Sequence, residues 1–136
     1  MRRLFTLIFV LLTVVAFASP VSKGDAERVA VNHYRHYAPS SITDFSVSAV
    51  SETRQNGVLT YYTFAFKSGG FVMVAADDAI VPILGSSYQG NFSVESVSPQ
   101  AQAWYDSYSN QILAIVNSNI SNAATRPEWE RLMENR

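Results

Sequence analysis

Residues 71–76 are more apolar and more sharply bounded than any other part of the chain. All six side chains are apolar, so neither face of this segment suits water. A Gly-Gly pair precedes the segment and an Asp-Asp pair follows it, which makes it too short and too closely bounded for a helix. The pattern predicts a central strand that is covered on both faces.

Two neighbouring segments complete the centre of the predicted sheet. Residues 59–66 are rich in β-branched and aromatic side chains, and the Gly-Gly pair can form the tight hairpin that joins them to residues 71–76. Residues 80–84 carry the next strand pattern. Because Pro82 cannot donate a hydrogen bond to a neighbouring strand, this third segment should lie at an edge of the sheet or begin at Pro82.

The fourth predicted strand lies earlier in the chain. Apolar residues at positions 45, 47 and 49 or 50 alternate with serines, the period-two pattern of a half-exposed strand. Residues 55–57, Gln-Asn-Gly, then form a turn into the strand at residues 59–66. Asn-Gly between two such strands is a strong local signal for a hairpin.

Two helices flank the predicted strands. Ser22 can cap a first helix of about sixteen residues, which Pro39 ends. Ser98 followed by Pro99 opens a second and longer helix, because serine caps helices and proline suits the first helical position. One stripe of this helix is apolar and consists of Ala101, Trp104, Tyr105, Tyr108, Ile112 and Ile115.

The order of these elements predicts an α+β fold: an antiparallel four-stranded meander with two helices packed on one face. We assign this domain to residues 19–118. Residues 119–136 form a polar linker and a short C-terminal helix or tail around Trp129. This tail either awaits a partner or packs as a last helix against the body.

The first 18 residues have the pattern of a secretory signal peptide. Two arginines precede the apolar run 4–15, and Ala16-Phe17-Ala18 offers a small-x-small cleavage site. The apolar run is shorter than the ~20 residues of a spanning helix, which favours cleavage over an uncleaved anchor. We therefore expect a secreted or periplasmic protein without a membrane segment after cleavage.

Composition and charge narrow the possible chemistry. The chain has no cysteine, which excludes disulfides, a thiol nucleophile, thiolate metal sites and a lipoprotein anchor. Its net charge of −1 gives no support to a nucleic-acid-binding surface.

The carboxylates and histidines do not form a recognisable catalytic or metal site. The neighbouring Asp77 and Asp78 diverge in a turn, and we interpret them as turn and capping residues rather than an acid–base pair. His33 and His36 are spaced for a metal but lack a third ligand, so a surface or core-edge pair is favoured. We therefore expect a binding domain, not an enzyme, with no cofactor and no metal.

Three blocks of sequence resemble a known family. They are Gly-Gly-Phe-Val-Met-Val-Ala-Ala-Asp-Asp from Gly69, Pro-Ile-Leu-Gly-Ser-Ser-x-x-Gly-Asn-Phe from Pro82, and Pro-Gln-Ala-Gln-Ala-Trp-Tyr-Asp-Ser-Tyr-Ser-Asn-Gln-Ile from Pro99. The chain resembles the propeptide of streptopain-type bacterial cysteine proteases and the free-standing Spi inhibitors that are similar to it. The resemblance covers about residues 22–116 and implies an antiparallel sheet with helices. Because the chain has no cysteine, it implies only the inhibitory half of such a protease.

The resemblance implies an inhibitor that occludes the active-site cleft of a streptopain-like cysteine protease. We expect the protease to be encoded nearby and the inhibitor to be a monomer when free. In the family a segment near the start of the second helix disturbs the catalytic histidine, and here that segment is residues 96–100. Gln100 stands where the family has an asparagine, and its longer amide can make the same hydrogen bonds from a shifted backbone. The candidate protease-binding residues are Tyr88, Gln89, Asn91, Phe92, Ser98, Pro99 and Gln100.

Two other functions remain open at this point. The chain could be a detached propeptide module that assists the folding of a protease without durable inhibition. It could also be an unrelated secreted binding domain. A streptopain-type protease encoded nearby would favour the inhibitor or the propeptide module over the unrelated binding domain.

Overall fold

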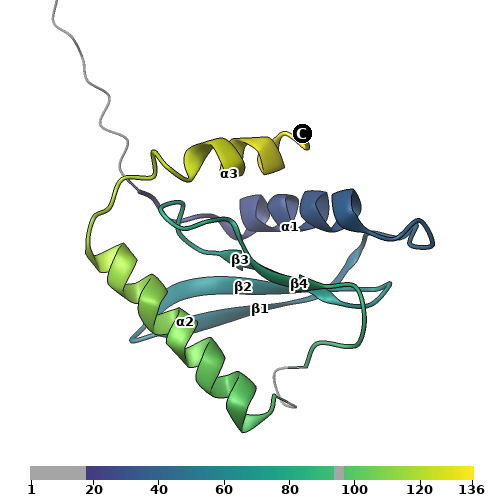
Figure 1. Ribbon diagram of the computed structural model, residues 1–136, viewed down its shortest axis with the longest axis horizontal. Coiled ribbons are helices and arrows are strands. Elements are labelled where there is room, and N and C mark those ends of the chain that lie inside the picture. Colours follow the sequence, from purple (N-terminus) through teal and green to yellow (C-terminus); the bar gives the residue numbers. More distant parts are fainter. Residues whose placement is uncertain (1–17, 94–96) are drawn as a thin grey trace, which may run out of the picture.

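The computed structural model describes residues 18–93 and 97–136, so the predicted signal segment up to residue 17 lies outside the described residues. None of the helices in these two ranges is long and apolar enough to cross a membrane. The elements, in chain order, are α1 (Lys23–Tyr37), β1 (Val47–Gln55), β2 (Val58–Phe66), β3 (Phe71–Ala75), β4 (Ile83–Ser87), α2 (Pro99–Asn117) and α3 (Arg126–Met133) (Figure 1).

The four strands form one antiparallel sheet in the order β1-β2-β3-β4. Asn56 and Gly57 have φ angles of 50° and 77°, as a tight hairpin between β1 and β2 requires. The strand that follows Pro82 lies at an edge, as proline at its start demands. The predicted α+β class and the four-stranded antiparallel meander are confirmed.

The prediction that both helices pack on one face of the sheet is wrong. Tyr34 of α1 stacks on Phe66, with ring centroids 3.8 Å apart. Neighbouring residues of a strand point to opposite faces, and Tyr105 of α2 lies on the other face beside Tyr61. In Figure 1, α2 lies across the sheet from α1 and α3. Consecutive residues of β2 are buried, so both faces of the sheet need cover. On one face α1 packs on β2 and β3, and on the other α2 packs on β1 and β2.

The cover that α2 provides is incomplete. Only Ser109 and Ile112 of this helix are buried, and both lie in its second half. Trp104, which the sequence pattern places on the buried stripe, is 50% exposed and contacts Tyr108 instead, with ring centroids 4.3 Å apart. The first half of α2 therefore leaves part of the sheet open to solvent.

The C-terminal tail packs against the body as a third helix. Trp129 donates its indole N–H to the carbonyl of Ile80 over 2.8 Å, and Asn32 of α1 donates to the carbonyl of Leu132 over 2.7 Å. Trp129 and Leu132 belong to the buried core. Of the two alternatives for residues 119–136, the structure supports the packed helix.

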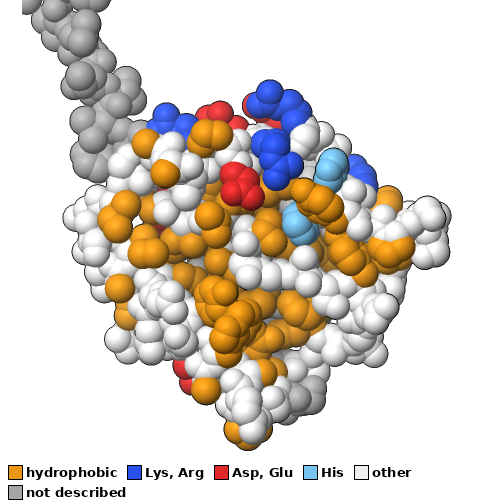
Figure 2. Space-filling view, viewed as in Figure 1, with side chains coloured by type: hydrophobic (Ala, Val, Ile, Leu, Met, Phe, Trp, Pro, Cys, Tyr) orange, Lys and Arg blue, Asp and Glu red, His pale blue; other side chains and the backbone are white. Residues whose placement is uncertain are grey.

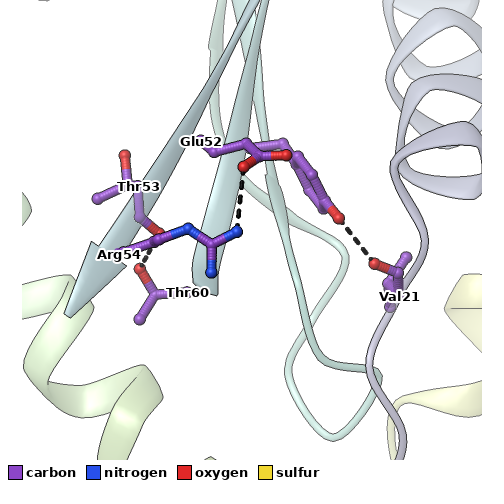
Figure 3. A network of polar contacts seen from close by, with 6 residues as sticks. Val21, Glu52, Thr53, Arg54 and Thr60 are labelled. Atoms are coloured by element: carbon purple, nitrogen blue, oxygen red, sulfur yellow. Dashed lines mark hydrogen bonds and ion pairs between the residues drawn. The ribbon is translucent and has the colours of Figure 1, made fainter. Parts of the chain in front are cut away.

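Side-chain hydrogen bonds from β2 hold the N-terminal segment against the sheet and join β2 to β1. Tyr62 donates its hydroxyl to the carbonyl of Val21 over 3.0 Å, and Thr60 donates to the carbonyl of Thr53 over 3.0 Å (Figure 3). Thr60 lies where the register of β1 and β2 shifts, so that it faces α2 together with its neighbour Tyr61. Thus β2 forms hydrogen bonds with the N-terminal segment through Tyr62 and with Ser109 of α2 through Thr60.

Candidate binding site

The loop after β4 is held against the β2–β3 hairpin by an exceptionally close backbone contact. Gly70 donates its N–H to the carbonyl of Gly90 over 2.7 Å. Its φ angle is +78°, and a Cβ atom at this position would lie 1.9 Å from the carbonyl oxygen of Ser87. Only glycine fits both the backbone angle and the space. The predicted turn residue therefore also fixes the position of the following loop.

A pocket of about 370 Å³ lies between this loop and the beginning of α2. Phe71 and Phe92 form part of its wall, with ring centroids 5.0 Å apart. Ser98 caps α2 by accepting the N–H of Ala101 over 3.2 Å, as the sequence predicts. The complete lining consists of Phe71, Gln89, Gly90, Asn91, Phe92, Ser93, Val97, Ser98, Ala101 and Tyr105.

Four of the seven candidate binding residues meet in this pocket: Gln89, Asn91, Phe92 and Ser98. Pro99 and Gln100 are exposed in the first turn of α2 and do not line it. Ser96, which begins the segment implicated by the family resemblance, lies outside the described residues. The structure therefore brings the loop and the start of α2 together at one surface.

Tyr88 is placed elsewhere, on the α1 side of the sheet. Ser87 pairs with Phe71 of the pocket wall, so the next residue points to the opposite face. There the ring of Tyr88 lies 5.0 Å from that of Tyr34. Burial raises the pKa of the Tyr88 hydroxyl, with smaller contributions from Tyr34 and Tyr37. The ring is thus part of the packing between β4 and α1.

The hollow continues from the pocket across the sheet face that α2 leaves open. Phe92 also lines three adjoining depressions together with residues of β1 and β2, including Ser51, Thr63 and Ala65. These side chains are too small to fill the space beneath the first half of α2. Small residues at alternate positions on two paired strands are the sequence signal that identifies this open face, and the sequence analysis missed it.

The pocket is built for binding by hydrogen bonds and apolar contact. Its described lining carries amide, hydroxyl and aromatic groups and no Asp, Glu, Lys, Arg or His. Figure 2 shows hydrophobic side chains gathered over the sheet and α2, whereas most charged side chains in this view gather near α3. Gln and Asn side chains both donate and accept hydrogen bonds, so such a surface can pair with peptide groups or an imidazole without ionisation.

The other candidate groups have structural contacts. Asp77 accepts the backbone N–H two residues later over 2.9 Å, and burial raises the pKa of its carboxyl. His33 lies 3.2 Å from the Ser86 hydroxyl, and His36 packs on Tyr37. Among the described residues no group of three His, Asp or Glu side chains is arranged to hold a metal.

Two comparisons relate the chain to known proteins. The model of the Spi protease inhibitor family matches residues 18–112, which include every residue that lines the pocket. The chain is also 25% identical over 123 residues to the Thiol protease/hemagglutinin PrtT of Porphyromonas gingivalis. That match covers 86% of this chain but only 14% of the relative. No solved structure matches the chain significantly.

Proposed function

The chain belongs to the Spi protease inhibitor family, and from this premise we propose that it inhibits a streptopain-like cysteine protease by occluding the active-site cleft. The observation that carries the proposal is the uncharged pocket between the loop after β4 and the start of α2. It combines an aromatic wall with amide and hydroxyl groups, on a surface that rigid elements hold in place. Loops positioned in this way by a scaffold commonly carry recognition.

Within this surface, each kind of side chain has a distinct task. Phe92 is half-buried against Phe71 and presents an apolar group to a partner. Gln89 and Asn91 are exposed and offer amides to the peptide groups of a protease cleft. Gln100 is exposed in the first turn of α2, from where its amide can reach a catalytic histidine. Binding energy at such surfaces is concentrated in a few residues, and we place it at Phe92 and Gln100.

Export is part of the proposal. The basic start, the apolar run and Ala16-Phe17-Ala18 favour cleavage after Ala18 and a secreted or periplasmic inhibitor. We place its target in the same compartment, with the protease encoded nearby. The inhibitor is proposed to be a monomer until it binds.

The test is a titration of the exported protein against two proteases. A streptopain-type protease should lose its activity in proportion to the added inhibitor and reach a low residual level near equimolar concentration. A papain-type protease serves as the control for specificity and should retain its activity. Full activity of the streptopain-type protease at a large excess of the protein would refute inhibition.

One observation favours a second function. The PrtT match places a segment similar to this chain within a much longer thiol protease, of which it covers 14%. Such a segment could assist the folding of a protease domain without durable inhibition. Refolding a streptopain-type protease with and without the protein separates the two functions. A higher yield of protease that stays active in the mixture would support the folding role.

A further inference from the structure

The carboxylate of Asp78 is the meeting point of three chain segments. Its Oδ1 accepts the N–H of Ser19 over 2.7 Å, and its Oδ2 accepts the Ser19 hydroxyl over 3.2 Å. Asn122, which precedes α3, donates its side-chain amide to Oδ2 over 2.7 Å. The Thr125 hydroxyl donates to the backbone carbonyl of the same aspartate. Asp78 therefore connects the start of the described chain to the segment that leads into α3.

Backbone pairing holds Ser19 in this position independently of the carboxylate. Asp78 donates its N–H to the carbonyl of Ser19 over 3.1 Å, and Val21 donates to the carbonyl of Ala76 over 2.9 Å. Pro20 and Asp77 form an antiparallel bridge between these two contacts. The nitrogen of Ser19 is thus held beside Oδ1. A positive charge on that nitrogen could pair with the carboxylate without any further ordering of the chain.

No cationic side chain in the described part of the chain forms an ion pair with Asp78. The ion pairs found there are Arg54–Glu52 and Arg136–Glu134. Arg126 contacts Asp78 only through Asn122: Arg126 donates to the Oδ1 of Asn122, and the side-chain amide of Asn122 donates to Asp78. The neighbouring Asp77 adds negative charge. Burial raises the pKa of the Asp77 carboxyl, and the charge of Asp78 raises it further.

We propose that Asp78 is the receptor for a new amino terminus at Ser19, formed when export removes residues 1–18. Hydrolysis of the Ala18–Ser19 peptide bond consumes one water and leaves a carboxylate on Ala18 and an ammonium group on Ser19. At pH 7 the ammonium form predominates, because an α-amino group has a pKa of about 7.7–8.0. The neutral hydrogen bond to Oδ1 then becomes an ion pair.

The inference rests on the cleavage included in the proposed function but not on inhibition. It adds that the cleavage position is matched to the fold. A chain that retains Ala18 carries its ammonium one residue too early and keeps a neutral N–H at Ser19. Processing after Ala18 would thus strengthen the contact between the N-terminal segment, the turn after β3 and the segment before α3.

The experiment compares two chains that differ by one residue, 19–136 and 18–136, each produced with a free amino terminus. Every described core residue lies within both chains. Ser19 is exposed and Asp78 is half-buried, so the ion pair should have the modest strength of a partly exposed pair. We expect the 19–136 chain to melt about 2 to 4 °C higher, and the difference to fall to about zero when both chains carry Asp78→Asn.

Selective acetylation of the Ser19 amino group provides a second comparison that needs no substitution. It removes the charge and leaves a single amide N–H at Ser19, as the peptide bond to Ala18 does, so it should lower the melting temperature of the 19–136 chain to that of the 18–136 chain. Equal melting of the free and acetylated chains would overturn the proposal. A difference between the 19–136 and 18–136 chains that persisted with Asp78→Asn would also overturn it. Intact mass of the exported protein tests the cleavage itself, because retained residues 1–18 would leave no amino terminus at Ser19.

Discussion

The ring of Tyr88 lies 5.0 Å from the ring of Tyr34, on the face of the sheet opposite the candidate pocket. The Tyr88 hydroxyl is buried without a hydrogen-bond partner among the described residues, whereas Tyr34 donates its hydroxyl to the carbonyl of Gly69 over 2.7 Å. The two rings therefore share one cluster, but only the Tyr34 hydroxyl forms a hydrogen bond within the described residues. This contrast makes them a matched pair for mutation.

Tyr88→Phe should raise the free energy of unfolding by about 1 kcal/mol, because it removes a buried polar group that lacks a partner. Tyr34→Phe should lower it by a similar amount, because it removes a hydrogen bond that is made. Denaturant unfolding of the two variants and the parent measures both effects. The assignment of Tyr88 to the core packing would be contradicted by a Tyr88→Phe variant that keeps the parent's stability but loses inhibition.

Val74→Asp should abolish cooperative folding. Val74 is fully buried in the centre of the sheet, so the substitution places an unpaired charge there, at a cost of several kcal/mol against a typical stability of ~5–15 kcal/mol. Val81→Asp is the matched control, because Val81 is 49% exposed and should tolerate the charge. Thermal melting checks both, and a parent-like transition for Val74→Asp would show that β3 is misplaced.

The sequence predicted the strands and helix caps because these depend on local chemistry. Ser22 and Ser98 cap helices, and the apolar residues of β3 could only be a buried strand. The sequence did not predict which face each helix covers. That choice depends on how the chain crosses the sheet between β4 and α2, and no periodic pattern encodes it.

The candidate site was predicted in part for the same reason. Gln89, Asn91, Phe92 and Ser98 meet because both segments lie near the end of the sheet where β4 ends. Side chains alternate between faces along β4, so Tyr88 points to the face opposite the pocket. The aromatic character of Tyr88 alone did not indicate which face it occupies. Tyr105 was assigned to a buried stripe but lines the pocket, because the small side chains beneath α2 leave space there.

Stability should fall at mildly acidic pH through His33. Burial, with smaller contributions from the charges of Arg131 and His36, lowers the pKa of His33 below its ordinary value of 6.5. The unfolded chain therefore binds the proton first as the pH falls. The contribution of this group is fully present above about pH 6.5 and decreases down to the pKa in the folded protein.

His33→Gln removes this titration and keeps a group that can hydrogen-bond to Ser86. Between pH 7.5 and 5.5 the melting temperature of the parent should therefore fall more steeply than that of the variant. Parallel curves for the two proteins would show that His33 does not cause the pH dependence.

The contact surface is tested by Phe92→Ala and Gln100→Ala. Each should weaken inhibition of a streptopain-type protease by at least about tenfold, because truncation of a central contact residue commonly costs more than 1 kcal/mol. Glu130→Ala is the control, since Glu130 is exposed on α3, across the sheet from the pocket. Melting curves must show that each variant is folded. Parent-like inhibition by both site variants would place the contact surface elsewhere.

The fluorescence of Trp104 can report binding at the start of α2. Trp104 is 50% exposed near the start of α2, whereas Trp129 is 7% exposed in the core. With Trp129→Phe, the tryptophan fluorescence of this protein comes from Trp104 alone, because the chain has two tryptophans. A protease that is catalytically inactive and lacks tryptophan at its cleft should shift this emission to shorter wavelength on binding. An unchanged spectrum in a complex shown to form by gel filtration would argue against docking at α2.

Occlusion of the protease cleft is the central claim, and alkylation of the catalytic cysteine measures it most directly. A streptopain-type protease is mixed with an equimolar amount of the 19–136 chain, and iodoacetamide modification of the catalytic thiol of the protease is followed by mass spectrometry. The 19–136 chain contributes no thiol of its own, because it has no cysteine. If the protein occludes the cleft, alkylation should slow at least about tenfold with the parent and much less with Phe92→Ala. Alkylation at the rate of the free protease, in a mixture where gel filtration shows the complex, would contradict the account.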